Sequence, residues 1–200
     1  IVKKNALNLH KDIETMMGQK GKIIQDLRIK VITFRDYLAD GENAMLKTDF
    51  FNLPEDTEIF NETINSITAF GGGDDPDDGL EALAYAIRSK WNTEGLKKRQ
   101  LIVVWSDAPA HELGFGKSAE NYPKKMAKDF NELTQWWGDK DNTGYMDYNS
   151  KRLILFTPDL PWWNEIRNSW DNVIHYMSEA GKGLEEVNYK QIIDAIAYSK

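Results

Sequence analysis

The chain has 200 residues, of which 41% are hydrophobic and 28% charged, as expected of one globular domain that buries most of the surface its unfolded chain exposes. Its formal net charge of −7 disfavours a nucleic-acid partner, because affinity for phosphates depends on Lys and Arg and no basic stripe stands out. The absence of cysteine excludes disulfides and thiolate metal sites, and no apolar run is long enough for a membrane span. We therefore expect a single domain over residues 1–200, with the cytoplasm as the default location.

The first predicted element is an amphipathic helix that ends near Gly18. Residues 27–34 are rich in β-branched side chains and predict a strand, and residues 47–53 predict a short edge strand. Pro54 then lies in the first turn of a further helix. The apolar stripe of the first helix recurs at intervals of four and three residues: Val2, Ala6, Leu9, Ile13 and Met16.

The middle of the chain places a glycine-rich acidic loop before a helix. Residues 71–73 are glycines, and residues 74–78 contain four carboxylates. The helix that follows has an apolar face and is succeeded by the continuously apolar residues 101–105, which predict a central strand covered on both faces. The apolar face comprises Leu80, Leu83, Ala84, Ile87 and Trp91.

The rest of the chain repeats this alternation of strand and helix. It predicts an α/β fold with a mainly parallel sheet flanked by helices. The remaining predicted elements are a loop over 108–122, a helix from Pro123, a strand over 153–156, a helix over 161–169, a strand over 173–177 and a helix over 189–198.

Carboxylates that follow predicted strands form the candidate site, because ligands of open parallel sheets bind beyond the carboxyl ends of the strands. Asp107 lies at such an end, and oxygen ligands from separate loops suit Mg²⁺, Mn²⁺ or Ca²⁺. A simpler interpretation holds for Asp77 and Asp78, since acids at a helix N-terminus cap it and interact favourably with its dipole without a metal. The same carboxylates argue against phosphate binding by the glycine-rich loop.

Three stretches of the sequence resemble one family of α/β domains. Residues 67–83 contain Gly-Gly-Gly-Asp-Asp-Pro-Asp-Asp-Gly-Leu, residues 101–109 read Leu-Ile-Val-Val-Trp-Ser-Asp-Ala-Pro, and residues 31–37 read Val-Ile-Thr-Phe-Arg-Asp-Tyr. They are similar to the second metal loop, the third metal strand and loop, and the second strand of bacterial von Willebrand factor type A domains. The resemblance covers nearly the whole chain and implies a doubly wound, Rossmann-like fold.

That family binds a divalent cation at a metal-ion-dependent adhesion site. The resemblance implies that Asp107 is the metal ligand of the third loop and Asp74 that of the second loop, where integrin-like members carry Thr. Mg²⁺ is the expected ion, with Mn²⁺ or Ca²⁺ as alternatives. The candidates for outer-shell or partner contacts are Asp75, Asp77, Ser106, His111, Arg35 and Asp36. For His111, the alternative interpretation is a solvated loop histidine.

The resemblance also implies a first central strand carrying an Asp-x-Ser-x-Ser segment, which these residues do not contain. The first predicted helix starts at Ile1, so we expect the missing strand to lie upstream and the domain to be N-terminally incomplete.

The function that the resemblance implies is noncatalytic protein binding of an adhesion or scaffolding type, in which an acidic side chain of the partner completes the metal coordination. Two alternatives stay open. Acids at strand ends also position metals in hydrolases and phosphotransferases that require Mg²⁺, and a degenerate scaffold could bind protein without metal. No nucleophile elbow or thiol is present, so no catalytic residue is assigned.

Two tryptophan pairs, Trp136-Trp137 and Trp162-Trp163, have two interpretations. They could form an aromatic platform for a ligand, since indole rings offer flat apolar faces with a hydrogen-bond donor. Packing in the core is the interpretation that we favour.

Overall fold

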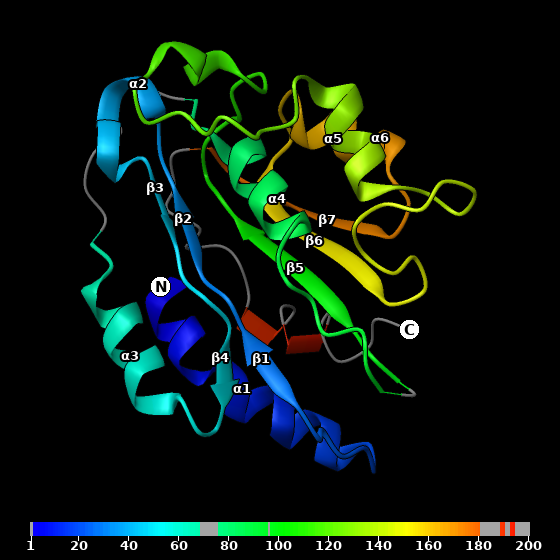
Figure 1. Ribbon diagram of the computed structural model, residues 1–200. Helices are drawn as coiled ribbons and strands as arrows, with labels where there is room; N and C mark the ends of the chain where they lie inside the picture. Colours follow the sequence, from blue (N-terminus) through cyan, green and yellow to red (C-terminus); the bar gives the residue numbers. More distant parts are fainter. Residues whose placement is uncertain (1, 69–75, 96, 181–188, 191–192, 195–200) are drawn as a thin grey trace.

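The computed structural model describes residues 2–68, 76–95, 97–180, 189–190 and 193–194. Its elements, shown in Figure 1, are α1 (Val2–Gln19), β1 (Leu27–Ile29), β2 (Ile32–Phe34), α2 (Tyr37–Asp40), η1 (Gly41–Asn43), β3 (Met45–Lys47), β4 (Phe51–Leu53), α3 (Thr57–Ser66), α4 (Gly79–Ile87), β5 (Gln100–Trp105), η2 (Phe115–Ser118), α5 (Phe130–Trp137), β6 (Lys151–Pro158), α6 (Trp163–Ser169) and β7 (Val173–Ser178). The predicted closing helix over 189–198 falls largely outside the described residues, and 189–190 and 193–194 are helical.

Three parallel strands in the order β5-β6-β7 form the central sheet, which confirms the α/β class and a parallel sheet flanked by helices. In the described part of the chain β5 pairs with β6 alone, so β5 is an edge strand here and not the predicted central one. The physical reason is that residues 27–34 pair with residues 45–53, not with β5.

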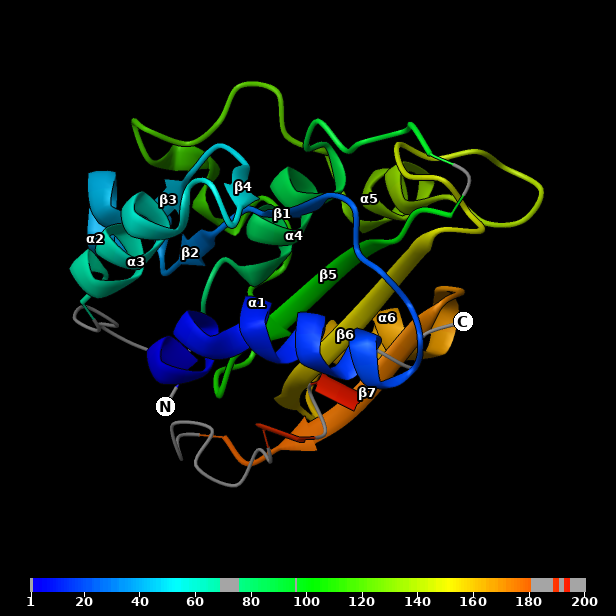
Figure 2. The same cartoon turned by 90° about the horizontal axis from the view of Figure 1, so that it is seen from below.

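Side chains alternate between the two faces of this sheet, as the pleat of a strand requires. Ile102 and Leu153 face one core, which α4, α5 and α6 cover. Val103 and Ile154 face a second core, to which α1 contributes Ile13. Figure 2 shows α1 on one side of the sheet and α4 and α5 on the other. Within the described ranges, no helix has both the length and the apolarity needed to cross a membrane.

The predicted strand over residues 27–34 is divided into two short strands. β1 pairs with β4 and β2 pairs with β3, both antiparallel. Between them, the backbone N–H of Val31 donates to the hydroxyl oxygen of Thr48 at 3.0 Å, where a regular ladder would use a backbone carbonyl. A side-chain acceptor that competes with the ladder in this way interrupts it.

The helix predicted from Pro123 begins later, at Phe130. The Asp129 carboxylate accepts a hydrogen bond from the Glu132 N–H at 2.9 Å, and the Glu132 carboxylate accepts one from the Lys128 N–H at 2.7 Å. These two bonds satisfy backbone donors at the start of α5 and set its first turn.

Candidate functional site

Three segments distant in sequence meet beyond the carboxyl end of β5, near α2 in Figure 1. Asp77 forms a parallel β-bridge with Ala110, and the His111 N–H donates to the Asp77 carbonyl at 2.9 Å. The Asp78 N–H donates to the Arg35 carbonyl at 3.0 Å. Through Asp77 and Asp78, the acidic loop is therefore hydrogen-bonded both to the loop after β5 and to the end of β2.

His111 and Asp36 form a buried pair at this junction. Their Nε2 and Oδ2 atoms lie 2.8 Å apart, with side chains 7% and 3% exposed. The imidazole also stacks on Phe115, with ring centroids 3.9 Å apart. The interpretation of His111 as a solvated loop histidine is therefore wrong, because a partner carboxylate and an aromatic ring hold it inside the protein.

Asp36 has a structural task besides its contact with His111. Its carboxylate caps α2 by accepting hydrogen bonds from the N–H groups of Leu38 and Ala39. Burial by itself would raise the pKa of Asp36, but the Ala39 N–H, His111 and the Leu38 N–H together lower it. The carboxylate therefore remains charged within the fold, where it links α2 to the loop after β5.

The other predicted site residues occupy different environments. Asp107 is half-buried and is the second residue after β5. The buried hydroxyl of Ser106 exchanges hydrogen bonds with the backbone of Ala108, within its own loop. The Arg35 guanidinium donates to the carbonyls of Asn43 and Thr68. Asp74 and Asp75 lie outside the described residues.

A complete ligand set for a metal is not assembled by the described residues alone. Among them, no group of three or more His, Asp or Glu side chains is placed to hold an ion. Of the two predicted ligands, Asp107 is described and Asp74 is not. The resemblance-based metal site therefore stays a prediction.

Two carboxyl groups, Asp78 and Glu81, are fully buried, which the sequence analysis did not predict. Asp78 stands at the N-cap position of α4 but does not cap that helix with its side chain, so the capping interpretation is wrong for this residue. Its Oδ2 accepts the Tyr37 N–H at 2.6 Å instead. Glu81 Oε1 accepts the Gly114 N–H and the Tyr122 hydroxyl, both at 2.8 Å.

Burial changes the acidity of both groups. It raises the pKa of Asp78 to about 7, opposed by the Tyr37 N–H and reinforced by the neighbouring charge of Glu81. Burial also raises the pKa of Glu81 against the bonds from Gly114 and Tyr122. The second oxygen of each group has no hydrogen-bond partner among the described residues, which favours the protonated acid. One signal was available in the sequence, since Glu81 is the single charge in the otherwise apolar α4.

Gly79, the first residue of α4, allows Trp163 to lie against the start of that helix. A Cβ at this position would lie 2.7 Å from the Trp163 ring and 3.3 Å from Phe34. We expect Gly79→Ala to lower the free energy of unfolding by about 1–3 kcal/mol through overpacking, despite the better helix propensity of alanine. Urea denaturation measures this, and a variant as stable as the parent would contradict the close packing. Gly18→Ala, where a Cβ has open space, is the control.

No protein-family model and no curated protein matches the sequence.

Proposed function

We propose that this chain is a protein-binding module of the von Willebrand type A kind, with a doubly wound fold, and that Mg²⁺ held by Asp74 and Asp107 assists binding at the carboxyl edge of its parallel sheet. The observation that carries the proposal is the Asp77–Ala110 bridge, which joins the two loops that bear these acids. Each acid precedes its end of this bridge by three positions in the sequence, and three residues of chain span at most about 11 Å.

The chemistry of the donors suits Mg²⁺ better than a cage for Ca²⁺. Mg²⁺ keeps several waters and needs only one or two protein carboxylates, whereas Ca²⁺ takes six to eight oxygen ligands. Two acids on neighbouring loops match the first requirement. With two carboxylates the ion retains little net charge, so the partner group best able to complete the coordination is a single acidic side chain or a neutral oxygen.

The remaining residues of the junction hold the loops in place. Asp36 and His111 connect α2 to the loop after β5, and Glu81 fixes Gly114 and Tyr122 farther along the same loop. This support positions Asp107 before any partner arrives, which lowers the ordering cost of binding.

Calorimetric titration with Mg²⁺ tests the proposal. We expect saturable binding that Asp107→Asn abolishes and Asp141→Asn preserves, since Asp141 is an exposed acid on the loop after α5. Equal Mg²⁺ binding by the parent and the Asp107→Asn protein would contradict the site. Turnover of phosphate esters that requires Mg²⁺ and is lost in Asp107→Asn would instead assign the chain to the hydrolases.

A further inference from the structure

A second site lies away from the sheet edge, in a cavity of about 720 Å³ between β1, the end of α4 and the segment before α5. This volume falls in the range of small-molecule sites. Its wall carries six basic side chains and a single acid, Asp49, in a protein with a net charge of −7. The basic residues are Arg28, Lys30, Arg88, Lys90, Lys124 and Lys125.

Most of this positive charge is not neutralised within the protein. Arg28 makes a long ion pair with Asp26, at 3.9 Å. In the ranges that the structure describes, the other five cations form no ion pair within 4 Å. Burial lowers the pKa of Lys30, and the positive charge of Lys47 lowers it further while Asp49 opposes both. Cations collected around one cavity repel one another, so an anion that enters it relieves this repulsion.

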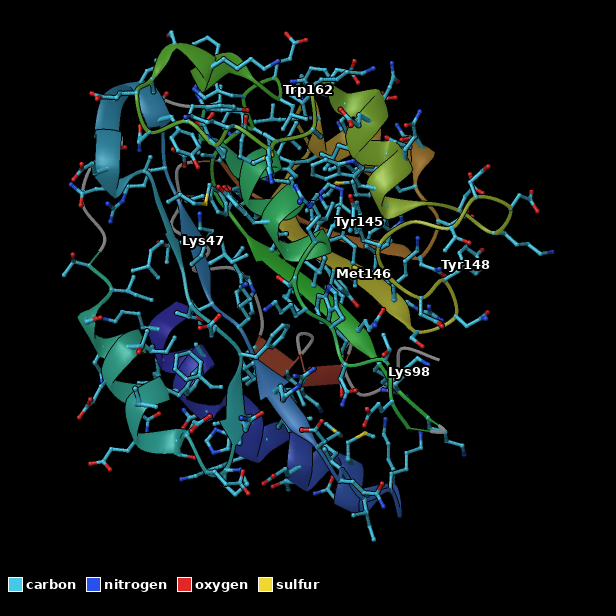
Figure 3. All side chains as sticks on the ribbon, in the orientation of Figure 1. Lys47, Lys98, Tyr145, Met146, Tyr148 and Trp162 are labelled. Carbon is cyan, nitrogen blue, oxygen red and sulfur yellow. The ribbon has the colours of Figure 1, made fainter. Side chains whose placement is uncertain are left out.

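Aromatic rings hold several of these cations in place. The Arg28 guanidinium lies 4.9 Å from the Phe50 ring centroid, and that of Arg88 lies 4.8 Å from Trp136. Arg88 also donates a 2.7 Å hydrogen bond to the Lys125 carbonyl. Lys47, labelled in Figure 3, extends from β3 towards α4, and its Nζ lies 3.7 Å from the ring centroid of Tyr85. Arginines stacked in this way keep a planar fork that matches phosphate oxygens.

The cavity also has an apolar wall suited to a flat group. Phe50, Met126 and Trp136 line it together with Ala84. Phosphate groups would fit the arginine forks, and a planar ring would cover part of this apolar surface.

We propose that this cavity binds a phosphorylated small molecule with a planar ring, of nucleotide size, and that it does so independently of the metal-assisted site. Arg28 and Arg88 hold the phosphates, the lysines add charge around them, and Trp136 contacts the ring.

Calorimetry in EDTA with ATP, pyrophosphate and adenosine as probes tests this site. We expect ATP to bind more tightly than pyrophosphate, and pyrophosphate more tightly than adenosine, with affinity falling as salt rises. The double variant Arg28→Gln/Arg88→Gln should weaken ATP at least about tenfold, as expected when two charge-assisted contacts are removed.

Two controls separate a built site from general charge. Lys4→Gln/Lys11→Gln removes the same charge from exposed positions of α1 and should leave ATP affinity unchanged, as should Asp107→Asn. The proposal is overturned if both double variants weaken ATP equally, or if a poly-glutamate peptide binds the parent more tightly than ATP does. Because EDTA removes free metal ions from this experiment, a failure of ATP to bind would not bear on the Mg²⁺ titration of the metal-assisted site.

Discussion

Replacing Trp163 by alanine is expected to lower the free energy of unfolding by about 3–5 kcal/mol. The Trp163 side chain is fully buried in the core that α4, α5 and α6 share with the sheet. Its indole N–H also donates to the Ala108 carbonyl at 3.1 Å, directly after Asp107. Truncation leaves a cavity and removes one of the two hydrogen bonds that the Ala108 carbonyl accepts, the other coming from the Ser106 hydroxyl, and both effects destabilise the fold.

The neighbouring tryptophan supplies a matched control. Trp162, labelled in Figure 3, is half-buried and packs on Phe130, with ring centroids 5.3 Å apart. We expect Trp162→Ala to destabilise the protein by clearly less than Trp163→Ala in urea denaturation. Trp163→Phe separates the two causes, because it retains most of the volume and removes the bond to Ala108. Equal losses in the two alanine variants would show that Trp163 has no special role.

These tryptophans illustrate how much of the fold the sequence predicts. Core packing, the interpretation favoured for both pairs, is confirmed for Trp137 and Trp163, which are almost fully buried. Trp136 is half-buried and lines the basic cavity, so one member of its pair also faces a candidate ligand site. Adjacent residues of a helix point in different directions, and hydrophobicity alone does not tell which of the two faces the core.

Long apolar patterns were enough to place α1, β5, β6 and β7 within a few residues, because burial on a sheet or helix face produces these patterns. The short strands before α2 were less predictable. Whether residues 27–34 join the main sheet or a hairpin depends on which strands lie beside them, and that is decided by long-range pairing.

The junction beyond β5 was only partly predictable for a related reason. Asp36, Asp77 and His111 were singled out as polar residues near strand ends, and the structure does bring them together. Their roles depend on partners up to 75 residues away, as the distance in sequence between Asp36 and His111 shows. The basic cavity could not be predicted from the sequence for the same reason, since Arg28, Arg88 and Lys125 come from three separate segments.

The pH dependence of stability is expected to report directly on Asp78. A carboxyl group whose pKa is 3.8 in the unfolded chain and about 7 in the folded one binds more protons when folded throughout that interval. By linkage, its contribution to stability is fully present below about pH 4 and is lost as the pH rises towards 7. The shift corresponds to at most about 4 kcal/mol across the window.

Asp78→Asn should flatten this part of the profile. Asparagine keeps an oxygen that can accept the Tyr37 N–H, and it cannot ionise beside Glu81. Urea denaturation between pH 4.5 and pH 7.5 (about half-unit steps, chosen to bracket the linkage window) should show the parent losing more stability than the variant.

Two further carboxyl groups, those of Glu81 and Asp36, also affect how stability depends on pH. The pKa of Glu81 is also raised, so a shallower slope of the same sign should persist in Asp78→Asn and diminish in Asp78→Asn/Glu81→Gln. The pKa of Asp36 is lowered, so its contribution is present above its unfolded value of 3.8 and disappears only as the pH falls below it, outside the window. As a control, Asp141→Asn should keep the slope of the parent protein. Parallel profiles for the parent and Asp78→Asn would contradict the prediction, because they would mean that Asp78 ionises in the folded protein as easily as in the unfolded chain.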